Sequence, residues 1–188
     1  PSIKNADKIT IGNLLNHRSG IANFTNDPTY LKWNTQKKSE SELLKIIELY
    51  GSDFEPNTKA SYSNSNYVLL SYILQKAYKK TYAELLTEKI TKPLGLTNTY
   101  IGSNINLQNN ESNSYIYLTS WQKETETDMS VPIGAGAIVS TPSDVTKFAN
   151  ALFDGKIITN ESLNLMKSMK DHYGYGLFEM PFGDKIGY

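Results

Sequence analysis

The sequence predicts an α+β fold that is mostly helical. Helix-start signals stand before one-sided apolar patterns along the first two thirds of the chain, whereas strand-like stretches are few and lie late. Composition supports a packed domain, because 39% of the 188 residues are hydrophobic and 20% are charged, an ordinary balance for a globular protein.

The first two long helices differ in how much of their surface is apolar. Over residues 39–50, Ser39 with Glu42 forms a capping-box pattern, the apolar side chains lie on one face, and Gly51 ends the helix. Residues 66–78 are apolar around nearly the whole circumference. The first is therefore expected to be a surface helix and the second a central helix enclosed by neighbours.

Cap and stop signals predict three further helices. The signals are Thr81 with Glu84 and a stop at Pro93-Leu94-Gly95, then Thr141-Pro142-Ser143-Asp144, then a shorter pattern over residues 160–168. Strands are expected over residues 133–139 and 173–178, and a polar loop over residues 103–114. Because two isolated strands rarely make a stable sheet, either other strands lie outside this sequence or the sheet is minimal.

Charge and composition argue against several classes of function. Nineteen basic and nineteen acidic side chains balance, and no block of like charges marks a nucleic-acid or membrane partner. The absence of cysteine excludes disulfides and thiol catalysis, and His17 and His172 lack metal-ligand spacing, so no metal or cofactor is expected. No apolar run approaches the roughly 20 residues of a spanning helix. Because the chain opens at Pro1, we expect a piece of a longer gene product.

Polar side chains gather just before the predicted central helix. If that helix begins near Ser65, then Ser63 or Asn64 caps it and Tyr62 lies just outside, where its side chain can project into a cleft. Asn64 offers both a donor and an acceptor, and a phenol held near a cation can accept a proton from a hydroxyl nucleophile. The alternative is that Ser63 and Asn64 only cap a helix, with Tyr62 packed at the surface.

The stretch Tyr62-Ser63-Asn64 resembles Tyr-x-Asn, the second active-site motif of the serine β-lactamase and penicillin-binding-protein family, in its class C β-lactamase and D-alanyl-D-alanine carboxypeptidase branch. Four further segments resemble that family in the same order. They are residues 9–21 ("LLxHxSGL"), 92–99 ("PLGMxxT"), 134–144 ("GGxxSTxxD") and 173–177 ("YGYGW"). Five segments in the correct order are far more specific than one motif.

The resemblance implies one partial domain over residues 1–188. Its helical lobe is expected at about residues 9–100 and 141–170, and a remnant of an antiparallel sheet at about residues 131–140 and 172–188.

The resemblance also assigns roles to individual residues. Tyr62 matches the general base or proton shuttle, and Asn64 matches the asparagine that hydrogen-bonds the substrate and the catalytic lysine. His17 lies in a segment that is mainly structural in the family, so it is expected to be packed and hydrogen-bonded. His172 has no motif partner and is expected at the surface.

Two motifs of the family are missing from the chain. No Ser-x-x-Lys, which supplies the nucleophile, precedes Tyr62. The literal match Ser120-Trp121-Gln122-Lys123 follows Tyr-x-Asn in a stretch without a strong helix pattern, and we attribute it to chance. A Lys-Thr-Gly or His-x-Gly motif is expected beyond Tyr188, where the sequence stops. We therefore expect this chain alone to be inactive.

For the parent protein, the resemblance implies a serine hydrolase that forms an acyl-enzyme on β-lactams, D-Ala-D-Ala peptides or esters. Its partner is then a small-molecule or peptide substrate, and export to the periplasm or cell surface is expected because such substrates lie outside the cytoplasmic membrane. The competing hypothesis is a non-catalytic module on the same fold that binds or senses cell-wall peptide. The order of the segments argues against an unrelated helical scaffold.

Overall fold

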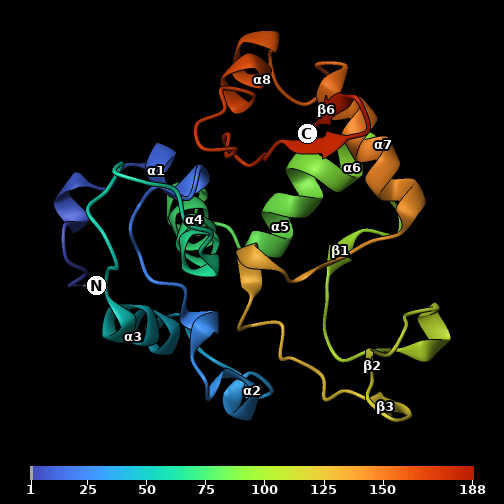
Figure 1. Ribbon diagram of the computed structural model, residues 1–188. Coiled ribbons are helices and arrows are strands. Elements are labelled where there is room, and N and C mark those ends of the chain that lie inside the picture. Colours follow the sequence, from blue (N-terminus) through green and yellow to red (C-terminus); the bar gives the residue numbers. More distant parts are fainter. Residues whose placement is uncertain (1) are drawn as a thin grey trace.

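The computed structural model describes residues 2–188, and helices predominate among them (Figure 1). The helices are α1 (Ile11–Leu15), α2 (Tyr30–Trp33), α3 (Glu40–Tyr50), α4 (Asn64–Tyr78), α5 (Tyr82–Leu86), α6 (Lys92–Leu94), α7 (Pro142–Phe153) and α8 (Asn160–Met166). The strands are β1 (Tyr100–Ile101), β2 (Tyr115–Tyr117), β3 (Trp121–Lys123), β4 (Ile138–Val139), β5 (Met180–Phe182) and β6 (Lys185–Gly187). Short 3₁₀ turns cover Ala6–Lys8, Phe24–Asn26, Leu107–Asn109 and Ile133–Ala135, and a π turn covers Thr87–Thr91.

The β-sheets are small and antiparallel. β1 pairs with β4, β2 with β3, and β5 with β6. The last two pairs are hairpins, whereas the β1–β4 pair joins segments far apart in sequence, with Tyr100 opposite Val139. The predicted α+β class, mostly helical with a little antiparallel sheet, is confirmed.

Several helices begin at the cap residues that the sequence indicates. The side-chain oxygen of Ser39 accepts from the Glu42 N–H, that of Thr81 from the Glu84 N–H, and that of Thr141 from the Asp144 N–H. Gly51 and Gly95 end their helices with φ of 66° and 63°, a conformation that glycine adopts without strain. The partners of each cap lie three residues apart, so the sequence alone predicts where these helices begin.

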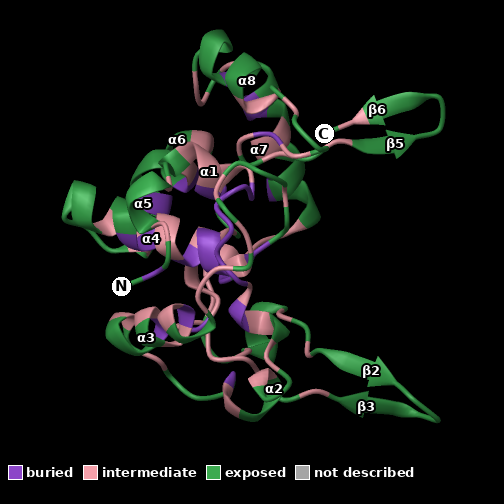
Figure 2. Cartoon of the chain, turned by 60° about the vertical axis from the view of Figure 1, so that its left-hand side comes forward, coloured by how far each residue is buried: buried purple, intermediate pink, exposed green. Residues whose placement is uncertain are grey.

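The hydrophobic core surrounds the N-terminal half of α4, and Figure 2 shows buried residues gathered beside that helix. The core cluster consists of Ile3, Leu14, Ile21, Phe24, Leu43, Ile47, Val68, Tyr72 and Val131. The prediction that α4 is enclosed on all sides is only half right, since Ile73 and Leu74 are 39% and 40% exposed. The reason is that α1 and the turn Ile133–Ala135 pack against α4 near its N-terminal half.

The predicted strand over residues 133–139 forms only at its end. Ile133–Ala135 is a 3₁₀ turn, and Ile138–Val139 is β4. A β-carbon at Gly134 would lie 2.5 Å from the Tyr67 carbonyl oxygen, so glycine lets this turn pack directly on α4. Contact with the helix therefore replaces strand pairing here.

Residues 173–178 do not form a strand either. Tyr173 makes isolated bridges to Lys170 and Phe178. The chain turns back before Tyr173 at Asp171 and His172, with φ of 52° and 68°, and again after it at Gly176, with a φ of 80°. The hairpin β5–β6 lies within residues 172–188, where sheet is predicted, whereas the hairpin β2–β3 lies in a stretch for which the sequence predicts no strand. Within residues 2–188, no helix has the length and apolar character needed to cross a membrane.

Candidate active site

Tyr62 and Asn64 lie close together at the start of α4, in residues 62–64, which are called the junction below. The Tyr62 side chain is half exposed, and its hydroxyl donates to the Asn64 Oδ1 atom at 3.1 Å. The Asn64 Nδ2 atom donates to the Thr25 hydroxyl oxygen at 3.0 Å. These two bonds fix the Asn64 amide, with its oxygen toward the phenol and its nitrogen toward Thr25. The structure thus places the two candidate residues within hydrogen-bond reach of each other.

The junction itself is held by side chains from distant parts of the chain. The Ser63 N–H donates to the Nδ1 atom of His17, and the Asn64 N–H donates to the Asn23 Oδ1 atom, each at 3.1 Å. The Ser63 hydroxyl makes no capping bond and donates to the Ala22 carbonyl at 3.3 Å. The predicted cap position is therefore right, but His17 and Asn23 satisfy the first N–H groups of the helix.

A second set of hydrogen bonds lies beneath the junction. The Ser19 hydroxyl donates to the Asn66 Oδ1 atom at 2.6 Å, and the Ser65 hydroxyl donates to the Ala22 carbonyl at 2.6 Å. Ser19, Ser65 and Asn66 are at most 1% exposed. Buried polar groups that are all paired stabilise one arrangement, so this network fixes the segment after α1 against α4.

His17 is packed and hydrogen-bonded, as its motif predicts. It is 6% exposed, and its ring centroid lies 4.6 Å from that of Tyr62, 5.1 Å from that of Tyr67 and 5.3 Å from that of Tyr173. Burial lowers the pKa of His17 to about 4, so the imidazole is neutral at physiological pH. His172, by contrast, is exposed and its Nδ1 atom lies 2.9 Å from a Glu179 carboxylate oxygen.

A cavity of about 180 Å³ opens beside Tyr62. Its walls are Leu15, His17, Tyr62, Tyr67, Ala135, Tyr173, Gly176, Leu177 and Phe178, and none of these described residues is a lysine or an arginine. The Tyr67 hydroxyl donates to the Leu15 carbonyl at 2.9 Å, and burial raises the pKa of Tyr67 to about 12. Tyr67 therefore remains a protonated structural group, whereas the half-exposed Tyr62 is free to meet a ligand.

Arg18 joins two segments that are far apart in the sequence, one with Asn57 and one with Asp171, close to the Tyr173 wall of the cavity. It is 2% exposed, its Nε atom donates to the Asn57 Oδ1 atom at 3.0 Å, and its Nη1 atom pairs with the Asp171 carboxylate. Asp171 immediately precedes the segment that carries Tyr173. Sequence reasoning missed Arg18, because no local pattern links residues so far apart along the chain.

The literal Ser-x-x-Lys match lies elsewhere. Ser120 is exposed in the turn of the β2–β3 hairpin, and Lys123 lies on β3. Residues three apart are neighbours on one face of a helix, and Ser120 and Lys123 do not share a helix.

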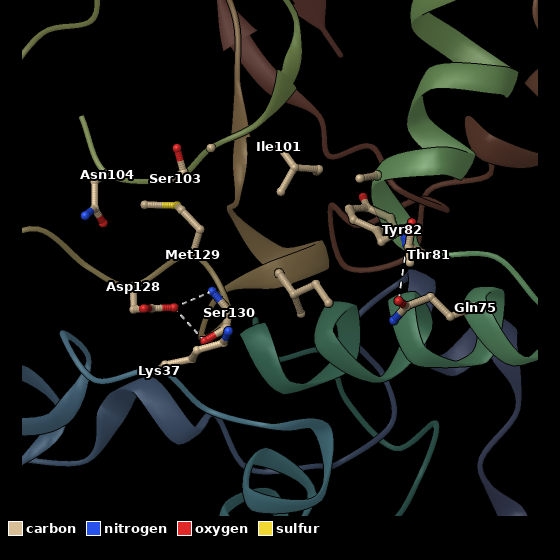
Figure 3. A pocket seen from close by; sticks show the side chains of 13 residues that line it. Lys37, Gln75, Thr81, Tyr82, Ile101, Ser103, Asn104, Asp128, Met129 and Ser130 are labelled. Atoms are coloured by element: carbon tan, nitrogen blue, oxygen red, sulfur yellow. Dashed lines mark hydrogen bonds between the residues drawn. The ribbon is translucent and has the colours of Figure 1, made fainter. Parts of the chain in front are cut away.

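Figure 3 shows a larger cavity, of about 570 Å³, whose lining does not include Tyr62 or Asn64. The Asp128 carboxylate accepts from the Ser130 N–H and hydroxyl at 2.9 and 2.6 Å, which lowers the pKa of Asp128. The Gln75 Oε1 atom accepts from the Tyr82 N–H at 3.2 Å. Asp128 and Gln75 are thus each hydrogen-bonded within the chain, and this cavity includes neither residue of the Tyr62 and Asn64 pair.

Comparison with known proteins places the chain in a family. The family model described as Beta-lactamase matches residues 2–183. The chain is 29% identical to the putative penicillin-binding protein PbpX of Bacillus subtilis over 96% of this chain and 45% of that protein. It is 26% identical to the teichoic acid D-alanine hydrolase of Staphylococcus aureus over 96% of this chain and 46% of that protein. The chain thus spans about half the length of the curated relatives it matches.

A solved structure agrees with the family match. The D-amino acid amidase of Ochrobactrum anthropi SV3 superposes with a TM-score of 0.85 at 29% identity, covering 99% of this chain and 58% of the amidase. The match extends over the helices and the small sheets alike. The chain belongs to the Beta-lactamase family and has the fold that serine β-lactamases share with penicillin-binding proteins.

Proposed function

We propose that the whole protein is a serine hydrolase that works through an acyl-enzyme, with Tyr62 as the catalytic base or proton shuttle and Asn64 as a substrate-binding residue. One observation carries the proposal: the exposed Tyr62 hydroxyl stands at a cavity, hydrogen-bonded to an Asn64 amide that Thr25 orients. Tyr67 lines the same cavity, but its hydroxyl is already bound to the Leu15 carbonyl. The family membership supplies the reaction class.

In the proposed reaction a serine hydroxyl attacks the substrate carbonyl while Tyr62 accepts the hydroxyl proton. The carbon–oxygen bond that forms gives a tetrahedral intermediate, whose collapse expels the leaving group with a proton and leaves an ester on the serine. Water then hydrolyses the ester. Tyr62 acts as a base only as a phenolate, which a nearby cation favours. The lysine of Ser-x-x-Lys would supply that cation from outside these residues.

The substrate candidates share one chemical feature. β-Lactams, D-Ala-D-Ala peptides and D-amino-acid esters or amides all present a carbonyl beside a polar group that Asn64 can bind through its donor or its acceptor. The similarity to a D-amino acid amidase and to a teichoic acid D-alanine hydrolase favours an ester or amide of a D-amino acid. Substrates of this family lie outside the cytoplasmic membrane, so we infer that the protein acts at the cell surface or in the periplasm.

The experiment is intact-mass spectrometry of the product of the complete open reading frame and of this 188-residue chain, each incubated with a penicillin and with a fluorophosphonate. We expect one covalent adduct on the complete product and none on the chain alone, because no Ser-x-x-Lys precedes Tyr62 in this chain. No adduct on either protein would favour the non-catalytic binding module instead. An adduct on the chain alone, mapped to Ser120, would overturn the assignment of the nucleophile.

A further inference from the structure

His17 lies where distant segments of the chain meet beside the cavity. It follows α1, and its ring contacts the Tyr62 ring of the junction, the Tyr67 ring of α4 and the Tyr173 ring of the segment after α8. Its φ of 56° is left-handed, a backbone conformation that is uncommon outside glycine. A single side chain therefore joins the segments that carry Tyr62 and Tyr173.

The hydrogen bonds around His17 determine which ring nitrogen carries the proton. The Ser63 N–H donates to Nδ1 at 3.1 Å, and the Asn66 Nδ2 atom lies 3.3 Å from the same nitrogen. The orientation of Asn66 is fixed, because its Oδ1 atom accepts the Ser19 hydroxyl at 2.6 Å. Two donors therefore face Nδ1, which must be an unprotonated acceptor, so the proton of neutral His17 sits on Nε2.

We propose that neutral His17 is a positioning residue for Tyr62: by accepting the Ser63 N–H and packing against the phenol, it fixes where the Tyr62 hydroxyl lies. This proposal rests on the catalytic role proposed for Tyr62. Ser63 directly follows Tyr62, so the hydrogen bond holds the backbone where the phenol leaves it. Precision here matters, because a displacement of about 1 Å in a reacting group can lower a rate about 100-fold.

Protonation of His17 removes this arrangement. An imidazolium carries an N–H at both nitrogens, so the Ser63 N–H and the Asn66 amide would each meet another donor. The titratable groups that face the ring are the phenols of Tyr62, Tyr67 and Tyr173. Among residues 2–188, no carboxylate or ammonium group pairs with the ring to stabilise a charged form. The pKa of about 4 that burial gives His17 keeps the acceptor form in place throughout the neutral range.

The test compares two variants of His17 in the product of the complete open reading frame. His17→Asn keeps an acceptor near the position of Nδ1, and asparagine tolerates the left-handed backbone at this residue. His17→Phe keeps an aromatic ring but removes the acceptor. Tyr62→Phe is measured beside them. The readouts are kcat and KM for a nitrophenyl ester as a function of pH, normalised to the fraction of active sites that fluorophosphonate labels.

The expected results separate positioning from a structural role. His17→Phe should lower kcat about 10- to 100-fold per labelled site with KM within about threefold, whereas His17→Asn should keep kcat within about threefold. The wild type should lose kcat as the pH falls through about 4, and His17→Asn should lack that acid limb. A purely structural role would reduce only the number of labelled sites.

The outcomes also separate this proposal from the proposed function. A wild-type kcat in His17→Phe, with a strongly reduced kcat in Tyr62→Phe, would overturn positioning and leave the function standing. A wild-type kcat in Tyr62→Phe would contradict both the catalytic role of Tyr62 and the positioning role of His17. If His17→Phe yields no folded protein, the pH profile of His17→Asn decides, and an acid limb that is unchanged from the wild type would overturn the proposal.

Discussion

The junction before α4 and the β2–β3 hairpin use similar side chains in opposite ways. Both contain tyrosine and serine, but the junction bonds to residues far along the chain, as when the Ser63 N–H donates to the His17 Nδ1 atom across 46 residues. The hairpin pairs only with itself, with Tyr117 opposite Trp121. Figure 2 shows the hairpin projecting from the body of the molecule, with its residues exposed.

This difference shows that residue type does not decide the role of a side chain here. Ser63 is 2% exposed and Tyr67 is half-buried, whereas Ser120 is exposed and Tyr117 is 63% exposed. Long-range hydrogen bonds in a buried place restrict each group to one geometry, as a proton-transfer site requires. Contacts within one exposed hairpin restrict the same side-chain types less, because a two-stranded hairpin is marginally stable by itself. Four predictions test whether the two regions differ as their contacts indicate.

The largest difference should appear in activity when a single phenol hydroxyl is removed. In the complete protein, Tyr62→Phe should lower kcat for a nitrophenyl ester by about 10²- to 10⁴-fold, the usual contribution of a positioned acid–base group. The half-exposed hydroxyl contributes little to stability, so the melting temperature should stay close to that of the wild type. The matched control is Tyr117→Phe, the same change in the hairpin, and equal losses in both variants would contradict the assignment.

The next largest effect should be a pH dependence of stability that comes from His17. Its pKa is about 4 in the folded chain and 6.5 in the unfolded chain. Between these pH values the unfolded chain binds the proton and the folded chain does not. The free energy of unfolding should therefore fall as the pH falls from 6.5 to 4, by up to about 3 kcal/mol, and stay level with respect to His17 at higher pH.

Urea denaturation of the complete protein and of His17→Asn at pH 4 and above pH 6.5 checks this pH dependence. The difference between the two proteins removes the contribution of other titrating groups. If the free energy of unfolding changes equally with pH in the wild type and in His17→Asn, then His17 does not titrate as its burial indicates.

Serine substitutions make the same chemical change in both regions. Ser19→Ala removes a hydroxyl that donates to the Asn66 Oδ1 atom and accepts from the Ile21 N–H at 3.0 Å. Because both partners are left buried without a bond, the free energy of unfolding should fall by about 1–3 kcal/mol. Ser120→Ala in the exposed hairpin turn should change it by about 0.5 kcal/mol or less. Thermal or urea unfolding measures both, and comparable losses would remove the contrast between the regions.

The fold was predictable where its determinants are close together in the sequence. Thr81 and Glu84 lie three residues apart, and their mutual capping starts α5 without help from the rest of the chain. The bend at Gly134 was not predictable, because it depends on contact with Tyr67 and Ser71 of α4. Without that contact the same residues have an ordinary strand pattern.

The candidate site divides in the same way. Tyr62 and Asn64 are neighbours in the chain, so their shared location followed from the sequence once the start of the helix was placed. The bonds that hold them come from His17, Asn23 and Thr25, each about 40 residues away or more. Local patterns in a single sequence do not indicate which residues about 40 positions apart will form hydrogen bonds. The resemblance indicated that His17 is packed, but its contact with Tyr62 required the structure.

The smallest expected effect belongs to the aromatic pair of the hairpin. The rings of Tyr117 and Trp121 meet edge to face with centroids 5.2 Å apart, yet both side chains are largely exposed. Trp121→Ala should therefore change the free energy of global unfolding by about 0.5 kcal/mol or less. It should nevertheless speed hydrogen exchange in the strands β2 and β3, because a local pair stabilises only its own hairpin. A larger global loss would show that the hairpin packs against another part of the complete protein. The hairpin would then be held by long-range contacts, as the junction is.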